Sequence, residues 1–483
     1  MPAPPYTFDM HVASLVASSL IALSGIARAT DDVRTPSVAT ELAQTRLLIV
    51  APDAWVDALN SFAQSKRSLP WIASCEVVSL KSLCQGHAGD EAEQLKRGLF
   101  SRWNRVEQAN TSAHDFDAVL LVGDTEVMPI RFMMLDRATT PAFDVAFYPC
   151  DLYFADLTDE SGAFDDWNAR VDGHHARYIG EVHGESAKDG PIDADGCQLV
   201  PEISIGRWPV STLDELNGVI AKAIAHDRAT LTSRSKDAAA RKVELVACGG
   251  WIDNAARIEG VARSMEPAFA VQRMFYSDTD ASRHPDPTRV IEALAQGRAL
   301  ILHTGHGQPH GWEHGLQAKD LARTSGQKSL AVLLSIGCST AEISAQPPYT
   351  AYLDADGVSH VGTNSGEIFS APPPPPACRQ SAQFGATSLG EASVRMPDGG
   401  AIAYIGCVTG SQPCAHTLLD GFAEFVGAHP TTSIGAAWKF ALTRYVRVEH
   451  LATLKPTSDW YPPSVYFQPM KFVLLGDPSV VLR

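Results

Sequence analysis

The sequences ALILHTGHGQ (299–308) and LAVLLSIGCST (330–340) decide the expected fold of this 483-residue chain. Each begins with an apolar run and ends abruptly in small or reactive residues. An uninterrupted apolar run of this length, bounded by glycine, is typical of a strand buried on both faces of a parallel sheet. Open α/β sheets carry their chemistry outside the carboxyl ends of their strands. If the two strands are neighbours, His306 and Cys338 emerge side by side at that edge.

These two residues are of the types that nucleophilic catalysis needs. A cysteine must become a thiolate to attack a carbonyl, and a nearby imidazole can take its proton and later give it to a leaving amine. Gly307 follows the histidine directly, so its N–H can approach a substrate carbonyl with no side chain in the way. Together with the N–H of Cys338 it would form an oxyanion hole, the arrangement that usually contributes most to acyl transfer.

Two other interpretations stay open on spacing alone. Buried cysteines are common and usually inert, and the chain has nine of them, so a cysteine at a strand end can be purely structural. His303, His306, His310 and His314 also cluster in the sequence, which suggests a metal site. Zinc ligands need fixed spacing on a helix or hairpin, however, and the glycines and the proline between these histidines disfavour a helix.

A His-Gly that ends one buried strand and a cysteine that ends the next resemble the caspase-like cysteine peptidases. The form Thr-Gly-His-Gly is similar to the gingipain family in particular. Further blocks resemble gingipain-type sequences and stand in the same order along the chain: LLVGDTEVMPIRF (120–132), DLYFADL (151–157), PEISIGRWPVST (201–212), GGAIAYIG (399–406) and KFVLLGDPSVVL (471–482).

The resemblance implies a cysteine endopeptidase that works through an acyl-enzyme, with Cys338 as nucleophile and His306 as general acid and base. In that family an acidic residue orients the histidine; Asp151 is the nearest match and Asp144 the fallback. The best-known members prefer basic P1 residues, which implies a weak preference for them here, with Asp151 and Asp156 as candidate pocket carboxylates. Two alternatives remain: a catalytically silent caspase-like scaffold that binds a protein partner, and a transpeptidase that uses the same dyad.

Other segments are expected near the same edge of the sheet. The strand 401–405 should end there, so residues 407–412 are candidates for a wall of the substrate pocket. We name Cys407, Val408, Thr409 and His303 as the substrate-binding residues. Residues 344–385 read as an insertion, with a hairpin at Asp354-Ala355-Asp356-Gly357 and a stiff run of five prolines at 372–376. The insertion either overhangs the cleft or forms an exposed loop.

Strand-like and helical segments alternate along the rest of the chain. Residues 46–50, 77–80 and 118–122 are expected strands, and 213–228 is an expected helix. This alternation predicts an α/β protein with two adjacent doubly wound, mostly parallel sheets flanked by helices, the second caspase-like. The expected domains are an N-terminal extension (1–44), an N-terminal α/β subdomain (45–230) and a caspase-like catalytic subdomain (241–483) with the insertion at about 344–385.

An acidic stretch at 151–172 interrupts the alternation. Closely spaced carboxylates are unfavourable unless they are solvated or neutralised by a cation. Two interpretations stay open: a solvated loop, and a structural calcium ion with Asp156, Asp159 and Asp165 as ligands. The spacing fits no EF-hand, and the expected chemistry itself requires no cofactor.

Composition and the N-terminus limit the partners and the location. The formal net charge is −16, whereas nucleic-acid binding depends on Lys and Arg that neutralise phosphates, so no nucleic-acid partner is expected. The resemblance implies a protein or peptide substrate. Residues 10–29 end like a secretory signal, but no Lys or Arg precedes them, and they are too weakly apolar for a stable membrane span. The nine cysteines follow no disulfide spacing, which slightly favours a cytoplasmic over an exported location.

Overall fold

The structure is a computed structural model. It describes residues 44–105, 114–137, 145–180, 192, 195–233, 241–249, 255–327, 329–381, 387–455 and 461–482. The signal-like stretch 10–29 and Asp144 therefore lie outside the described residues.

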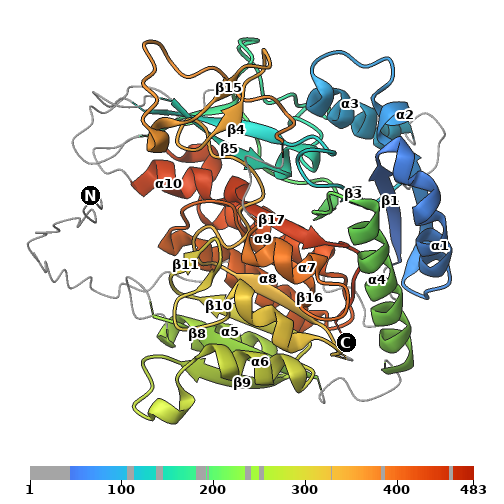
Figure 1. Cartoon of the computed structure of the whole chain (residues 1–483), viewed down its shortest axis with the longest axis vertical. Coiled ribbons are helices and arrows are strands. Elements are labelled where there is room, and N and C mark those ends of the chain that lie inside the picture. Colours follow the sequence, from blue (N-terminus) through green and yellow to red (C-terminus); the bar gives the residue numbers. More distant parts are fainter. Residues whose placement is uncertain are drawn as a thin grey trace, which may run out of the picture. The chain divides into compact units, whose positions relative to one another are not determined.

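Ten strands form one large sheet (Figure 1). Their order across the sheet is β2 (Ile72–Ser79), β1 (Thr45–Ala51), β3 (Ala118–Val122), β7 (Ser204–Trp208), β17 (Phe472–Gly476), β16 (Ala401–Cys407), β13 (Ala331–Ser335), β10 (Leu300–Thr304), β8 (Lys242–Ala247) and β9 (Ala270–Phe275). All neighbouring pairs are parallel except β16 and β17. The expected mixed α/β fold with a mostly parallel sheet is confirmed.

The first four strands in this order come from the N-terminal part of the chain and the other six from residues beyond 240. The two groups meet where β7 lies beside β17, through the single residue pair Arg207 and Leu475. The two adjacent sheets expected from the sequence are thus joined edge to edge into one.

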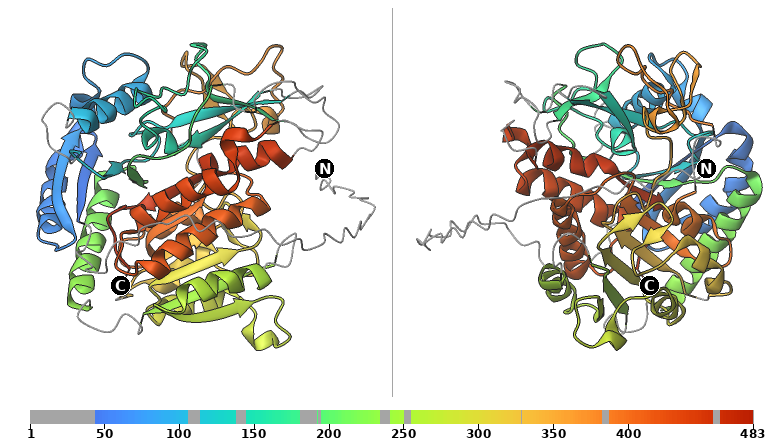
Figure 2. Two further views of the ribbon diagram at one scale, coloured as in Figure 1. Left: turned by 180° about the vertical axis from the view of Figure 1, so that it is seen from behind. Right: turned by 60° about the vertical axis from the view of Figure 1, so that its left-hand side comes forward.

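Helices cover both faces of the sheet (Figure 2). Helix α5 (Ala255–Met265) packs on α8 (His416–Ala428), which packs on α9 (Ile434–Val448), while α4 (Leu213–Ser233) contacts both α1 (Val56–Arg67) and α7 (Leu389–Arg395). The other helices are α2 (Leu80–Cys84), α3 (Glu91–Trp103), α6 (Pro287–Ala295) and α10 (Tyr461–Phe467). None of the helices in the described ranges has both the length and the apolar character needed to cross a bilayer.

The strands that lead to the site are apolar because they are buried on both sides. Every residue of β10, β13 and β16 is buried, which explains why these segments are continuous apolar runs without alternation. Helix α6, which precedes β10, starts at Asp286, whose side chain accepts a hydrogen bond from the Arg289 N–H. It ends before Gly297 at φ +77°, the left-handed conformation for which glycine is favoured.

Three smaller sheets surround the large one. They are β5 (Val145–Cys150), β4 (Arg131–Arg137) and β6 (His175–Gly180); the pair β11 (Gly307–Gln308) and β12 (Gly311–Trp312); and the pair β14 (Tyr352–Leu353) and β15 (Ser359–His360). The last pair is antiparallel and confirms the hairpin expected around residues 354–357.

The segment after the turn that contains Cys338 packs on the N-terminal part of the chain. The Phe147 N–H donates to Pro347 O at 2.7 Å and the Gln380 N–H to Thr125 O at 3.0 Å, and this segment lies beside β4 and β5 (Figure 1). Within it, His360 lies between two carboxylates, with 2.8 Å from its Nδ1 to Glu367 Oε1 and 3.1 Å from its Nε2 to Asp354 Oδ2.

Candidate active site

The strands β10 and β13 are parallel neighbours, which is the condition under which His306 and Cys338 were expected to emerge side by side. Their register pairs His303 with Ser335. His306 and Cys338 each follow three residues later, at the carboxyl edge of the sheet. His306 and Cys338 therefore lie at the same distance along the chain beyond a pair of residues that are aligned across the two adjacent strands.

The backbones that carry these residues are in direct contact. A Cβ added to Gly307 would lie 2.7 Å from Cys338 O and 2.9 Å from Gly337 C. A Cβ added to Gly337 would lie 3.1 Å from the Gly307 nitrogen. Distances this short leave no room for side chains. Glycine at both positions therefore allows the loop that carries His306 (residues 305–309, the histidine loop) to touch the turn that carries Cys338 (residues 337–342, the cysteine turn).

The turn after β13 is strained and is held by the end of β16. Ser339, next to Cys338, has φ +55°, a conformation that is unfavourable for a residue with a side chain and is found often at functional sites. Its N–H donates to Thr409 O at 2.8 Å, and the Ala341 N–H donates to Cys407 O at 3.0 Å. Backbone hydrogen bonds to the predicted pocket wall thus fix the conformation of the turn.

The thiol of Cys338 is half-buried. The Ser411 N–H lies 3.3 Å from its Sγ, which places residue 411 beside the sulfur. Of the three pocket residues predicted in this segment, Cys407 and Val408 have fully buried side chains, and Thr409 is nearly so. The predicted wall therefore contacts the cysteine turn through the backbone of residues 407–411. The group of this wall that lies against the Cys338 sulfur is the Ser411 N–H.

The four clustered histidines have different environments. His303 is fully buried in the core, His306 is half-buried, and His310 is exposed. His314 stacks on Tyr276 with ring centroids 4.5 Å apart. Across the described ranges, no three His, Cys, Asp or Glu side chains converge as metal ligands would, so the histidine metal site is not formed.

His303, predicted to bind substrate, lies beneath the site instead of in its wall. Its Nδ1 is 2.8 Å from Ser335 Oγ, and its ring stacks on Trp312 with centroids 4.3 Å apart. Burial lowers the pKa of His303 to about 3, so the ring is neutral. The Trp312 indole N–H in turn donates to Tyr404 Oη at 3.0 Å. This chain of contacts joins β10, β13, β12 and β16 below the edge of the sheet that carries His306 and Cys338.

Asp151, predicted to orient His306, is paired with a different residue. Its two carboxylate oxygens accept hydrogen bonds from Arg207 Nε at 2.8 Å and Nη2 at 2.7 Å. Both side chains are buried, and Arg207 also donates to Gly123 O at 3.0 Å. The structure therefore places Asp151 in an ion pair that joins the loop after β5 to β7.

The three predicted calcium ligands do not form a common site. Asp156 is fully buried and accepts hydrogen bonds from the Trp167 indole and the Leu199 N–H, both at 3.0 Å. Asp159 accepts bonds from the turn that follows it, including the Ser161 N–H at 2.8 Å, and Asp165 accepts from the Trp167 N–H at 3.2 Å. One oxygen of Asp156 and one of Asp165 are buried without a hydrogen-bond partner, but no group of three such side chains in the described ranges is arranged as metal ligands would be.

Comparison with known proteins identifies the family. A model described as Peptidase family C25 matches residues 40–483. The chain belongs to peptidase family C25. It has the caspase-like, gingipain-like fold of a cysteine peptidase. A search of curated proteins found no match.

Solved structures share the fold of this C25 peptidase at low sequence identity. The Arg-specific cysteine proteinase gingipain R is 14% identical with a TM-score of 0.56, and the match covers 92% of this chain and 79% of that one. A structure described only as a protease is 16% identical with a TM-score of 0.55, covering 91% and 78%. The complex of Porphyromonas gingivalis RgpB pro- and mature domains is 14% identical with a TM-score of 0.50, covering 91% and 80%.

The peptidase also has a carboxylate near the cysteine that the sequence gave no reason to select. Glu342 lies in the cysteine turn, and its N–H donates to Ser339 O at 3.1 Å. Its Oε2 accepts a 2.7 Å hydrogen bond from Gln346 Nε2, which also donates to Val408 O at 2.9 Å. Burial raises the pKa of Glu342 to about 7. Only the three-dimensional meeting of the cysteine turn with the pocket wall reveals this residue.

Proposed function

We propose that this C25 peptidase is an endopeptidase in which Cys338 is the nucleophile and His306 the general acid and base. The observation that carries the proposal is the contact between Gly307 and the Cys338 backbone, which brings the two residues to the same edge from adjacent strands. No other pairing of a histidine loop with a half-buried cysteine turn occurs among the described strand ends at this edge.

The chain's own groups supply each step of peptide hydrolysis. His306 takes the proton of the Cys338 thiol, and the thiolate attacks the carbonyl carbon of the scissile bond. The N–H groups of Gly307 and Cys338 stabilise the oxyanion that forms. His306 then gives the proton to the leaving amine, and water, activated by the same imidazole, hydrolyses the thioester.

The other cysteines are poor nucleophiles. Seven of them are buried, and burial raises the pKa of Cys407, for example, to about 12. Cys378 is half-buried like Cys338, but burial raises its pKa as well. Because the thiolate is the reactive form, Cys338 should react first with an electrophile.

We further propose a preference for basic P1 residues, and Glu342 is the carboxylate that supports it best. Asp151 is committed to Arg207 and Asp156 to two N–H donors. Glu342 is partly buried beside the cysteine turn, and within the described part of the chain no cation forms an ion pair with it. An unpaired, partly desolvated carboxylate binds a cation favourably, and a P1 lysine or arginine would provide one.

Mass spectrometry after treatment with a peptidyl chloromethylketone tests the nucleophile. We expect a single adduct on Cys338, its loss in Cys338→Ala, and its retention in Cys378→Ala as the matched control. Peptide hydrolysis should disappear in Cys338→Ala and nearly so in His306→Ala, with the double variant hardly worse, because such groups act as a unit. An unmodified Cys338 in folded protein would favour the silent scaffold, and aminolysis products in place of hydrolysis would favour the transpeptidase.

Specificity is tested with a peptide library varied at P1. We expect Lys or Arg to be preferred, and we expect Glu342→Gln to lower kcat/KM for these substrates more than for a peptide with an apolar P1 residue. A preference for acidic or apolar P1 residues in the unmodified enzyme would contradict the proposed pocket while leaving the dyad untouched.

A further inference from the structure

We propose that helix α7 holds the histidine loop and the cysteine turn in place relative to each other, and that Arg395 is a positioning residue for the His306–Cys338 pair. The inference rests on the proposed function. It concerns a helix that follows the insertion and contributes no side chain to the reacting atoms.

The first two N–H groups of α7 bind both catalytic segments. The Leu389 N–H donates to Pro309 O at 2.6 Å, and Pro309 lies three residues after His306. The Gly390 N–H donates to Thr340 O at 2.9 Å, and Thr340 lies two residues after Cys338. The first N–H groups of a helix have no partner inside it. In α7 two of these adjacent donors fasten two loops that come from different strands.

The contact is close because residue 390 has no side chain. A Cβ at this position would lie 2.9 Å from Tyr404 Cδ1 and 3.1 Å from both Leu475 Cδ1 and Thr340 O. The start of the helix therefore rests directly on the cysteine turn and on Tyr404, the residue that binds the Trp312 indole. A shift of α7 would displace the turn with it.

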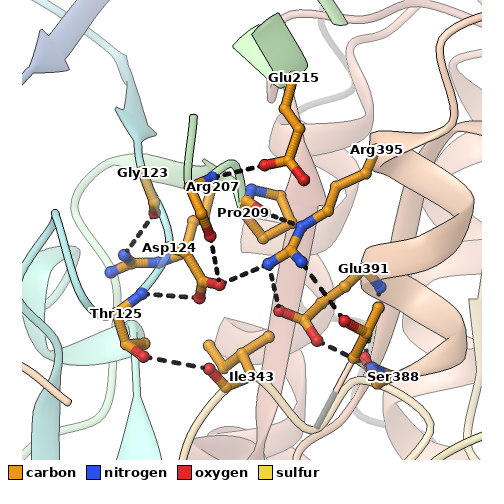
Figure 3. A network of polar contacts seen from close by, with 12 residues as sticks. Gly123, Asp124, Thr125, Arg207, Pro209, Glu215, Ile343, Ser388, Glu391 and Arg395 are labelled. Carbon is orange, nitrogen blue, oxygen red and sulfur yellow. Dashed lines mark hydrogen bonds and ion pairs between the residues drawn. The ribbon is translucent and has the colours of Figure 1, made fainter. Parts of the chain in front are cut away.

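A polar network fixes where the start of α7 lies (Figure 3). The helix begins with a capping box, in which the Ser388 N–H donates to Glu391 Oε2 at 2.8 Å and the Glu391 N–H donates to Ser388 Oγ at 3.3 Å. Arg395, one turn later, donates from Nη2 to Glu391 Oε1 at 3.0 Å. The Arg395 guanidinium thus fixes the side chain of Glu391, the second member of the capping box.

The same guanidinium ties α7 to the N-terminal part of the chain. Arg395 donates to the Asp124 carboxylate, two residues after β3, and to Pro209 O, directly after β7 (Figure 3). Asp124 is itself oriented by the Thr125 N–H at 2.7 Å. The Thr125 hydroxyl lies 3.4 Å from Ile343 O, in the segment that follows the cysteine turn. Arg395 therefore connects α7, the cysteine segment and the ends of two strands of the other group.

The far end of α7 is also anchored. Lys222 Nζ, from α4, lies 2.5 Å from Val394 O, 2.6 Å from Met396 O and 3.1 Å from Ala401 O. Burial lowers the pKa of Lys222 to about 7, and its N–H groups satisfy carbonyls that have no partner within the helix. With both ends and one side fixed, the position of the first two N–H groups is set by the surrounding protein.

The test compares Arg395→Met with Lys66→Met in the full-length enzyme. Lys66 is the matched control, because it also lies between two carboxylates, Asp227 at 2.8 Å and Asp477 at 2.5 Å, but is fully buried and belongs to α1. We expect both variants to lower Tm. Only Arg395→Met should lower kcat, by roughly tenfold to a hundredfold, since a misplacement of about 1 Å costs about a hundredfold, while KM changes little.

A second measurement detects the dyad itself. The rate at which iodoacetamide alkylates Cys338, followed against pH, reports how readily the thiol ionises beside His306. We expect Arg395→Met to move this profile to higher pH and Lys66→Met to leave it unchanged. Arg395→Lys keeps the charge and loses the forked geometry, so we expect it to move the profile in the same direction by a smaller amount. It serves as the test variant if Arg395→Met does not fold.

The outcomes separate this inference from the proposed function. An unmodified enzyme that neither hydrolyses peptides nor alkylates at Cys338 would overturn the proposed function. An active enzyme in which the Arg395 variants lower Tm as Lys66→Met does, with kcat and the alkylation profile unchanged, would overturn the positioning role and leave the peptidase assignment intact.

Discussion

Gly307→Ala should separate the segment that carries His306 from the segment that carries Cys338 while the protein still folds. The added Cβ would lie 2.6 Å from Thr340 Cγ2, 2.7 Å from Cys338 O and 2.9 Å from Gly337 C, whereas ordinary contact begins at 3.4 Å. The threonine methyl group can rotate, but the other two atoms are backbone. The loops must therefore move apart by about 0.7 Å to restore contact distance. The backbone of Gly307 itself is not left-handed, so the effect comes from the contact and not from φ.

The expected loss follows from this displacement. A misplacement of about 1 Å costs about a hundredfold in rate, so Gly307→Ala should lower kcat by roughly tenfold to a hundredfold. Overpacking of this kind typically costs about 1–3 kcal/mol in the free energy of unfolding.

The assay is hydrolysis of a fluorogenic peptide, with Tm and iodoacetamide labelling of Cys338 as checks that the protein is folded and the thiol present. Gly260→Ala in α5 is the control, because its Cβ would meet only the Arg263 guanidinium at 3.7 Å. Unchanged kcat in folded Gly307→Ala would show that the two backbones do not need their close contact, and the argument for the dyad would lose its main support.

Three further predictions concern groups around the site. Ser335→Ala should lower the free energy of unfolding by about 1–3 kcal/mol, because it leaves buried His303 Nδ1 without its partner; chemical denaturation measures this. Asp151→Asn should lower it by about 3–5 kcal/mol, because buried Arg207 loses its counter-charge; a stable variant with reduced kcat would instead restore Asp151 to the catalytic site. For His360, burial lowers the pKa, but its two carboxylate partners outweigh burial and raise it. The stabilisation of the hairpin by protonated His360 is complete below about pH 6.5 and is lost as pH rises through the raised pKa. Protection of amides 352–360 from hydrogen exchange, corrected for the intrinsic exchange rate, should therefore fall from pH 6 to 8. His360→Gln should abolish this change.

The sequence predicted the strands that are buried on both faces closely, and it misplaced the start of the edge strand β2. Residues 46–50 and 118–122 are continuous apolar runs and correspond closely to β1 and β3. The strand β2 begins at Ile72, well before the expected start at 77, because it lies at the edge of the sheet and has exposed positions along its length. A half-exposed edge strand has no continuous apolar run to mark it.

Local sequence features predicted the positions of His306, Gly307 and Cys338 at the strand ends. They did not predict which distant side chains pair with each other. The small residues of the Thr-Gly-His-Gly motif and the abrupt end of the apolar run before Cys338 are local features, and both follow from parallel neighbouring strands. The partner of Asp151 is Arg207, fifty-six positions further along the chain. No local pattern distinguishes a carboxylate that will meet a guanidinium from one that will meet an imidazole.

The weak junction of the two strand groups explains why the polar network lies where it does. Among the described residues, the strand pairing between the two groups is limited to one pair, Arg207 and Leu475, across β7 and β17. Such a short pairing does little to fix the position of one group relative to the other, so side-chain and loop contacts must hold them together. Many of these contacts meet at residues 123–125: Arg207 binds Gly123 O, Arg395 binds Asp124, and Thr125 contacts both Ile343 and Gln380. The short segment after β3 therefore fixes the cysteine turn, the insertion and α7 at once, although it contributes no reacting group.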